Sequence, residues 1–163
     1  MTTWERTTHK YQARKEAIQT VRRWQQEGYD VVFTNGCFDL LHLGHLYYLA
    51  QARDLGDYLV VGLNSQESVS RLKGDHRPIK DEQTRAHLLA ALQFVDLVVR
   101  FEEDTPLALI EQLRPDCLVK GGDYQIEQIV GAAEVQSWGG RVLTLPFVDG
   151  YSTTALEEKI RSW

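Results

Sequence analysis

Short apolar runs alternate along the chain with longer stretches in which apolar and polar residues are mixed. The runs at residues 31–34, 58–63, 97–99, 117–119 and 141–145 are rich in Val, Leu and aromatic residues, which is typical of strands covered on both faces. Between and around them the sequence predicts helices over residues 13–27, 44–55, 66–72, 81–93, 106–113, 127–138 and 155–161. Strands that alternate with helices predict an α/β fold built on a parallel sheet.

Turn and capping residues support these boundaries. Gly28 follows the first long helix as its stop signal, and Asp81 stands before the helix that runs to residue 93. Thr105-Pro106 combines a capping residue with a proline at the first helical position. Ser152-Thr153-Thr154 offers hydroxyl caps for the last helix. We therefore expect a doubly wound sheet of about five parallel strands flanked by helices.

The stretch from residue 31 to residue 49 places a strand, a tight turn and a helix start close together. Asn35-Gly36 ends the strand, and the next helix begins near Gly44 with apolar positions at helical spacing that we expect to face inward, namely Leu43, Leu46, Tyr47 and Ala50. His42 and His45 then fall in the first helical turn, where free backbone N–H groups and the helix dipole favour an anion. This arrangement predicts a phosphate-binding site.

Other polar clusters also follow the carboxyl ends of predicted strands or lie in adjoining loops. These clusters are residues 36–45, Asn64, residues 73–77, residues 120–123 and residues 152–154. In open α/β sheets, ligands bind beyond the carboxyl ends of the strands, at the point where the strand order reverses. The sequence therefore predicts one site to which all these clusters contribute.

Length and composition limit the classes of protein that fit. The chain has 163 residues, of which 43% are hydrophobic and 25% charged, so we expect one domain over residues 13–163 preceded by a loosely ordered leader at residues 1–12. A net charge of −5 argues against nonspecific nucleic-acid binding. Two cysteines and no long apolar segment argue against a disulfide framework, a signal peptide and a membrane span. We expect a cytoplasmic protein.

Two alternatives compete with the phosphate site at the histidine pair. His42 and His45 could cap the helix and pack at the edge of the core, or they could bind a metal together with Cys37. A zinc site needs a third and usually a fourth ligand, and Cys117 stands alone in a predicted strand. The residues alone leave the structural and phosphate-binding alternatives open.

The segment Gly36-Cys37-Phe38-Asp39, followed by His42-Leu43-Gly44-His45, resembles the H-x-G-H signature of the cytidylyltransferase-like nucleotidyltransferase superfamily. Four later segments are similar, in the same order, to the adenylyltransferase domain of bacterial heptose-phosphate enzymes: residues 71–78, 101–106, 119–124 and 152–154. The similarity covers roughly residues 28–160. No sugar-kinase segment is recognisable, so the chain resembles the stand-alone D-glycero-D-manno-heptose 1-phosphate adenylyltransferases. The resemblance implies a Rossmann-like fold.

The resemblance also implies a set of site residues. The residues expected at the reacting phosphate are His42, His45 and Lys73. The nucleotide is expected to contact Asn35, Gly36, Cys37, Phe38, Gly44, Asn64, Lys120, Gly122, Asp123, Ser152, Thr153 and Thr154. The sugar phosphate is expected to contact Asp39, Arg77 and Arg85. The partners implied are ATP, a sugar 1-phosphate and a second copy of the chain, with Mg²⁺ held mainly through the ATP phosphates rather than by protein ligands.

Several of these residues have a structural alternative. Asp39 could cap a local turn, and Lys73 could belong to a solvated basic loop. Arg85 could face either the site or solvent. The superfamily pattern has an arginine three residues after the last hydroxyl of the 152–154 motif, whereas Glu157 occupies that position here and Lys159 is the nearest substitute.

The activity implied is transfer of AMP from ATP to heptose 1-phosphate. Two alternatives stay open: a cytidylyltransferase acting on glycerol 3-phosphate or a similar small phosphate, and a nucleotide-binding module without turnover. The spacing of the motifs does not choose between adenine and cytosine.

Overall fold

The computed structural model describes residues 1–163 and contains one sheet in which all strands are parallel. The strand order is β1-β4-β3-β2-β5-β6. The strands are β1 (Tyr11–Gln12), β2 (Val31–Gly36), β3 (Tyr58–Asn64), β4 (Leu97–Phe101), β5 (Cys117–Gly121) and β6 (Arg141–Leu145). The predicted α/β doubly wound fold is confirmed, with six strands rather than five.

The additional strand comes from the segment that we expected to be a loosely ordered leader. Residues 1–12 instead form α1 (Thr3–Thr8), capped by Thr2, and β1, which pairs with β4. The Lys10 ammonium donates to the carbonyls of Leu92 at 3.2 Å and Val95 at 2.7 Å. The sequence concealed this arrangement because α1 buries no residue and β1 is too short to show a period.

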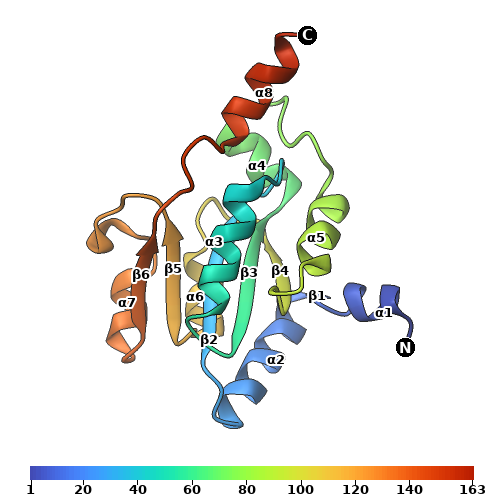
Figure 1. Ribbon diagram of the computed structural model, residues 1–163. Helices are drawn as coiled ribbons and strands as arrows, with labels where there is room; N and C mark the ends of the chain where they lie inside the picture. Colours follow the sequence, from blue (N-terminus) through green and yellow to red (C-terminus); the bar gives the residue numbers. More distant parts are fainter.

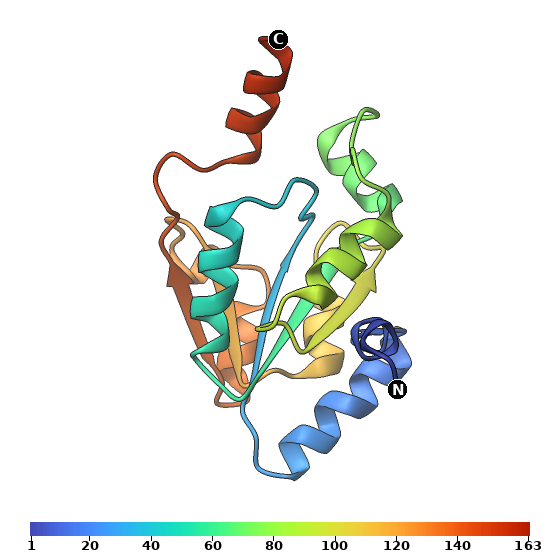
Figure 2. The same ribbon diagram turned by 45° about the vertical axis from the view of Figure 1, so that its right-hand side comes forward.

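Helices cover both faces of the sheet (Figures 1 and 2). They are α2 (Arg14–Gln26), α3 (Leu43–Arg53), α4 (Gln66–Lys73), α5 (Glu82–Ala91), α6 (Leu107–Leu113), the 3₁₀ helix η1 (Ile126–Gln128), α7 (Ala132–Ser137) and α8 (Thr153–Arg161). Buried residues of α2, α6 and α7 form one core cluster, and those of α3 and α5 form the other. None of the helices is both long enough and apolar enough to cross a bilayer.

Alternate side chains of β2 enter opposite clusters, as the pleat of a strand requires. Val31 and Phe33 pack with α2, α6 and α7, whereas Val32 packs with α3 and α5. All three are completely buried. The continuous apolar run that predicted this strand therefore reflects burial on both faces.

The inward face of α3 differs from the expected one. Tyr48, Leu49 and Ala52 are buried against the sheet, whereas Leu43 and Tyr47 remain 50% and 51% exposed. Apolar residues occur on every side of this helix, so their spacing alone was compatible with two different faces turned toward the core. Contact with β2 and β5 decides between them, because the Tyr48 hydroxyl bonds with Thr34 and donates to the Val119 carbonyl.

The helix predicted over residues 127–138 is interrupted. It consists of η1, a turn and α7, with Gly131 at a φ of +88° as the N-cap of α7. A Cβ at this glycine would lie 2.7 Å from the Ile110 side chain. Close packing of α7 on α6 therefore needs glycine in a left-handed conformation, and this conformation breaks the helix.

Strand β2 is the point at which the strand order reverses. It pairs with β3 on one side and with β5 on the other, because the chain runs from β2 through β3 to β4 and then crosses back over the sheet to β5. The N-terminus of α3 and the whole of α8 lie beyond the carboxyl ends of these strands (Figures 1 and 2). The fold therefore leaves space for a ligand above β2.

Candidate active site

A cavity of about 440 Å³ lies beyond the carboxyl ends of the central strands, within the range usual for small-molecule sites. The predicted site residues that line it are Asn35, Gly36, Cys37, Phe38, Asp39, His45, Asn64, Lys73, Arg77, Lys120 and Thr153. The predicted residues outside its lining are His42, Gly44, Arg85, Gly122, Asp123, Ser152 and Thr154. Segments far apart in the sequence thus meet at the predicted edge of the sheet.

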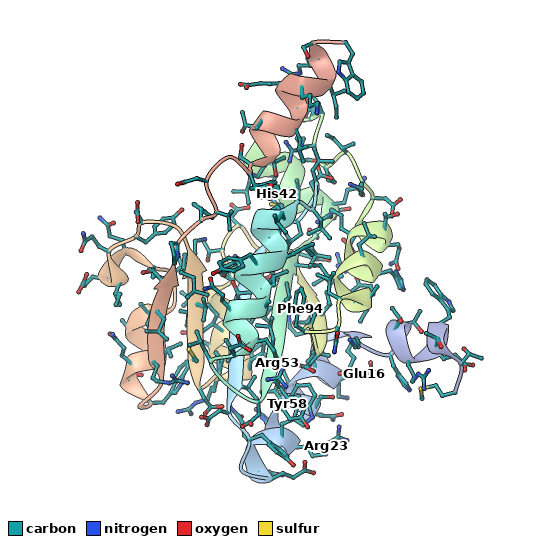
Figure 3. All side chains as sticks on the ribbon, in the orientation of Figure 1. Glu16, Arg23, His42, Arg53, Tyr58 and Phe94 are labelled. Carbon is teal, nitrogen blue, oxygen red and sulfur yellow. The ribbon has the colours of Figure 1, made fainter.

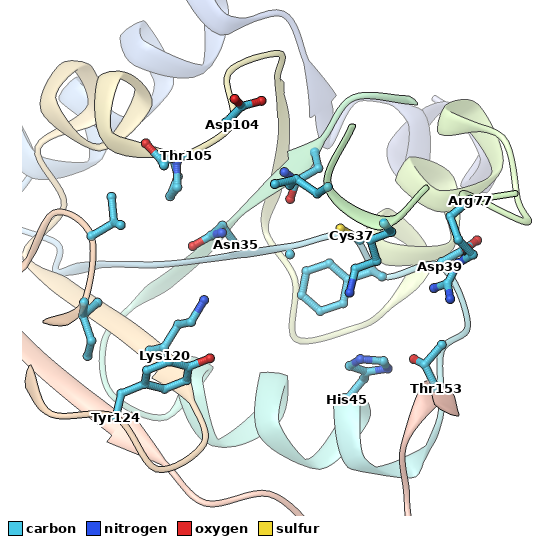
Figure 4. A pocket seen from close by; sticks show the side chains of 18 of the residues that line it. Asn35, Cys37, Asp39, His45, Arg77, Asp104, Thr105, Lys120, Tyr124 and Thr153 are labelled. Carbon is cyan, nitrogen blue, oxygen red and sulfur yellow. Dashed lines mark hydrogen bonds and ion pairs between the residues drawn. The ribbon is translucent and has the colours of Figure 1, made fainter. Parts of the chain in front are cut away.

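The cavity has two ends, which Figure 4 shows on either side of Asn35. The end beside the N-termini of α3 and α8, here called the helix end, carries Asp39, His45, Lys73, Arg77 and Thr153. The opposite end, here called the loop end, follows β4 and β5 and carries Asp104, Thr105, Pro106, Lys120, Tyr124, Gln128, Ile129 and Val130. Most of the positive charge is at the helix end, and most of the apolar surface is at the loop end.

His45 occupies the first turn of α3 and lines the helix end. Its Nδ1 accepts a hydrogen bond from the backbone N–H of His42 at 3.4 Å. Burial, together with the nearby His42, lowers the pKa of His45 to about 4. The ring is therefore neutral at pH 7, and acceptance at Nδ1 places the single ring proton on Nε2.

His42 lies behind His45 rather than in the lining of the cavity. Figure 3 labels His42 at the end of α3 that lies nearest α8, and its ring stacks on that of His45 with centroids 3.8 Å apart. Burial lowers the pKa of His42. A Cβ at position 44 would lie 2.9 Å from this ring, so Gly44 makes room for the stacked pair.

Asp39 joins the turn after β2 to the loop after α4. The backbone N–H groups of Ile79 and Lys80 donate to its carboxylate at 2.6 Å and 2.8 Å, and Arg77 Nε donates at 2.8 Å. Burial acts to raise the pKa of Asp39, but these donors outweigh it and leave the pKa below its ordinary value. Asp39 therefore organises the loop that carries Arg77 into the cavity.

Arg85 is completely buried beneath the cavity rather than in contact with it. Its Nη1 donates to the carbonyls of Cys37 and Asn64, both at 2.9 Å, and its Nε donates to the carbonyl of Lys80 at 3.2 Å. Burial lowers the pKa of this guanidinium. Arg85 thus joins three segments of the site and lines no part of the cavity.

Lys120 lines the loop end, and the two glycines after it lie just outside the lining. The Lys120 ammonium lies 5.4 Å from the centre of the Tyr124 ring, and burial lowers the pKa of Lys120. Gly122 has a φ of +108°, and a Cβ there would lie 2.7 Å from the Phe147 ring. This backbone conformation requires glycine, whereas the Asp123 side chain is exposed outside the cavity.

The N-terminus of α8 completes the helix end. Ser152 caps the helix by accepting from the Ala155 N–H at 3.0 Å, and Thr153 lines the cavity. Glu157, one turn further on, accepts from Arg77 Nη1 at 2.7 Å. Lys159 is exposed and lines no part of the cavity. Arg77 thus places a guanidinium against Glu157, at the position where the superfamily pattern has an arginine.

Several lining residues were absent from the predicted set: Leu72, Asp104, Thr105, Pro106, Tyr124, Gln128, Ile129 and Val130. Thr105 does not cap α6, which begins after Pro106 without a side-chain cap. The sequence could have indicated Thr105 as a lining residue only if the start of α6 had been known, because a threonine before a helix is usually taken as its cap. Residues 128–130 reach the cavity because the helix predicted there is broken.

The residues present do not form a protein-held metal site. No group of three or more His, Cys, Asp or Glu side chains is placed to hold an ion. The two lining carboxylates are already engaged, Asp39 by the loop donors and Asp104 by Arg71 at 3.0 Å. Asp39 and Asp104 are the lining carboxylates that a divalent ion entering with a ligand would meet.

Comparisons with known proteins give the family. Residues 33–159 match the family described as Cytidylyltransferase-like. The Bifunctional protein HldE of Magnetococcus marinus is 60% identical over 144 residues, which are 88% of this chain and 30% of that protein. The Bifunctional protein HldE of Geotalea uraniireducens is 61% identical over 142 residues, 87% of this chain and 29% of that protein. The chain thus spans less than a third of the length of these curated relatives.

Two solved structures are similar in fold. A lipopolysaccharide core biosynthesis protein from Thermoplasma volcanium is 30% identical, with a TM-score of 0.60 over 77% of this chain and 100% of that one. A pantoate-beta-alanine ligase from Francisella tularensis, complexed with beta-gamma ATP and beta-alanine, has a TM-score of 0.62 at 15% identity, over 93% of this chain and 76% of that one. The second of these likenesses shows the fold alone. The family match over residues 33–159 establishes that the chain belongs to the cytidylyltransferase-like family.

Proposed function

We propose that this chain transfers AMP from ATP to heptose 1-phosphate, giving ADP-heptose and pyrophosphate. The observation that carries the proposal is the meeting of a neutral histidine, a lysine, an arginine and a helix N-terminus at one end of a single cavity. Identity of about 60% to HldE proteins supports heptose as the sugar, together with the resemblance to the adenylyltransferase domain of heptose-phosphate enzymes.

The reaction needs positioning and positive charge more than it needs a base. An oxygen of the sugar phosphate attacks the α-phosphorus of ATP, a new P–O bond forms, and the bond to the pyrophosphate oxygen breaks. A phosphate monoester has its second pKa near about 6, so the nucleophile is already ionised at pH 7. The protein accelerates the step by holding the two anions in line and stabilising the charge that develops on the α-phosphate.

His45 is suited to that stabilisation. With Nδ1 occupied by the His42 N–H, its Nε2–H donates to a non-bridging oxygen of the α-phosphate. The low pKa keeps this proton arrangement across the physiological range. His42 acts by packing against His45 and fixing its orientation.

Lys73 and Arg77 supply positive charge at the same end, and Thr153 adds the N-terminus of α8. Lys73 serves the α-phosphate and Thr153 the outer phosphates. Arg77, which the resemblance assigns to the sugar phosphate, is assigned here to the outer phosphates because Glu157 ties it to α8. Gly36, Cys37, Phe38 and Asn64 form the floor on which the nucleotide lies. Mg²⁺ enters as part of the nucleotide substrate, held by phosphate oxygens and water.

The loop end offers contacts for the uncharged parts of both ligands. Tyr124, Pro106 and Ile129 present flat or apolar surfaces suited to a base, and Asp104 and Thr105 present acceptors suited to sugar hydroxyls. Base selection then rests on a few hydrogen bonds, which can reject a wrong partner by about 10²-fold or more.

A substrate panel tests the proposal. Pyrophosphate release is measured for ATP and CTP, each combined with heptose 1-phosphate, hexose 1-phosphates and glycerol 3-phosphate, with Mg²⁺ present. We expect the highest kcat/KM for ATP with heptose 1-phosphate. Better turnover of CTP with glycerol 3-phosphate would establish the cytidylyltransferase alternative and refute the substrate assignment. Release from no pair, with ATP still bound in calorimetry, would identify a nucleotide-binding module and refute nucleotidyl transfer.

We also propose a homodimer that works in the cytoplasm, where ATP is available. The exposed apolar side chains of Leu43 and Tyr47 on α3, at 50% and 51%, support self-association. Light scattering coupled to gel filtration tests it, and a monomer at micromolar concentration would contradict the dimer.

A further inference from the structure

Helix α8 is joined to the rest of the protein by very few contacts. None of its residues is buried, and it projects beyond the carboxyl ends of the strands (Figure 2). The side-chain hydrogen bond and ion pair that connect it to another element are those between Glu157 and Arg77, with Glu157 Oε1 at 2.7 Å from Arg77 Nη1. This single contact therefore has a large influence on where the N-terminus of α8 lies.

Arg77 is held from two sides. Its Nε donates to Asp39 at 2.8 Å while its Nη1 donates to Glu157. The side chains of Arg77, Asp39 and Glu157 are 13%, 1% and 24% exposed, so the three charges are largely shielded from water. Arg77 Nη2 donates to no protein acceptor, and Arg77 lines the helix end of the cavity. Two carboxylates thus fix the guanidinium and leave one nitrogen available to a ligand.

Glu157 and Thr153 lie on the same face of α8, because residues four apart in a helix are neighbours. Thr153 lines the cavity, and Glu157 contacts the arginine that lines it beside Lys73. Loss of the Glu157 carboxylate would release both parts at once: Arg77 would keep only Asp39 as a partner, and α8 would lose its anchor. The carboxylate is therefore placed to control two groups that face the same ligand.

We propose that Glu157 is a positioning residue that holds Arg77 and the N-terminus of α8 against the triphosphate. This inference rests on the proposed function, since it assigns Arg77 to the outer phosphates of ATP. Glu157 itself stays outside the cavity lining and does not touch the substrate. A carboxylate at this position repels an anion directly, but it contributes positive charge indirectly by fixing the arginine of another loop.

A double-mutant cycle tests the proposal with Glu157→Gln, Arg77→Ala and the double variant, each assayed for pyrophosphate release and for ATP affinity by calorimetry. We expect Glu157→Gln to lower kcat/KM about tenfold, mainly through a higher KM for ATP, as for loss of a hydrogen bond between charged groups. In the Arg77→Ala background the same change should alter kcat/KM less than about twofold, because its partner is already absent. Glu157→Asp, which keeps the charge, should retain more activity than Glu157→Gln.

The matched control is Glu158→Gln, which removes the same charge from the next residue of α8, an exposed side chain without an ion pair. It should leave kcat/KM within about twofold of the wild-type value. Equal losses from Glu157→Gln in both backgrounds, or no loss in the wild-type background, would overturn the positioning role. A wild-type protein without pyrophosphate release would refute the proposed function instead. The ATP affinities of wild type, the two single variants and the double variant would then decide by themselves whether Glu157 and Arg77 are coupled.

Discussion

Replacement of Arg85 by methionine separates a structural role from contact with substrate. Arg85 is completely buried, and its guanidinium donates three hydrogen bonds to the carbonyls of Cys37, Asn64 and Lys80. Methionine fills a similar volume without any donor. The three carbonyls belong to the turn after β2, to the last residue of β3 and to the residue before the Asp81 cap of α5, so the variant loosens three segments of the site together.

The expected loss follows from these contacts. A hydrogen bond from a charged donor is worth about 1.5–3 kcal/mol, so three such bonds represent about 4.5–9 kcal/mol. Removal of the buried charge returns several kcal/mol of desolvation cost. We expect a net loss of about 3 kcal/mol in the free energy of unfolding, which for a domain of this size lowers Tm by about 6–12 °C. Turnover should fall as well, because the loops that carry Cys37 and Asn64 lose their common anchor.

Urea denaturation followed by circular dichroism measures the change. The control is Arg22→Met on α2, an exposed arginine without a hydrogen-bond partner, which should change the unfolding free energy by less than about 0.5 kcal/mol. An Arg85→Met protein with wild-type stability but no turnover would refute this reasoning and would place the guanidinium in contact with substrate.

Further predictions concern His45 and the N-terminal segment. His45→Ala should lower kcat by about 10² to 10³, the scale for one oxyanion donor, with Tm nearly unchanged; a parallel collapse of stability would indicate a purely structural histidine. The pKa of His45 in the folded protein is about 4, below its ordinary value of 6.5. The contribution of neutral His45 to stability is therefore full above pH 6.5 and declines as the pH falls toward 4. A stability difference between wild type and His45→Gln that does not change with pH would contradict this. Deletion of residues 1–12 should lower the unfolding free energy by about 2 kcal/mol or more, through the lost Lys10 bonds and the exposed edge of β4; an unchanged urea midpoint would contradict the role of β1.

The elements that the sequence predicted well are those whose residues carry a local signal. The run at residues 31–34 is the doubly covered strand that its composition predicted, and Asp81 and Ser152 cap the helices that they were expected to cap. Gly28 adopts the positive φ of a helix stop. In each case the residue type, the turn chemistry and the final packing agree, so neighbouring residues contained enough information.

Elements without such a signal were wrong or were missed. Strand β1 has two residues, and its pairing with β4 joins segments more than eighty residues apart. The inward face of α3 depends on a bond between Tyr48 and Thr34, and the break at Gly131 depends on the position of Ile110. These features arise from contacts between elements, so they become visible only when the sheet order is known.

The predicted site divides in the same way. Residues at the carboxyl ends of strands, such as Asn35, Asn64 and Lys120, line the cavity because strand direction alone carries them there. The role of Arg77 could not be predicted in this way, because its place is set by two carboxylates, Asp39 and Glu157, that lie 38 and 80 positions away in the chain. Position 157 was the one departure from the superfamily pattern, and the structure explains it through this partner. A negative residue at a proposed phosphate site is therefore informative when a partly buried arginine from another segment lies within hydrogen-bond distance, because in our proposal the pair delivers to the ligand the charge that a local arginine would otherwise provide.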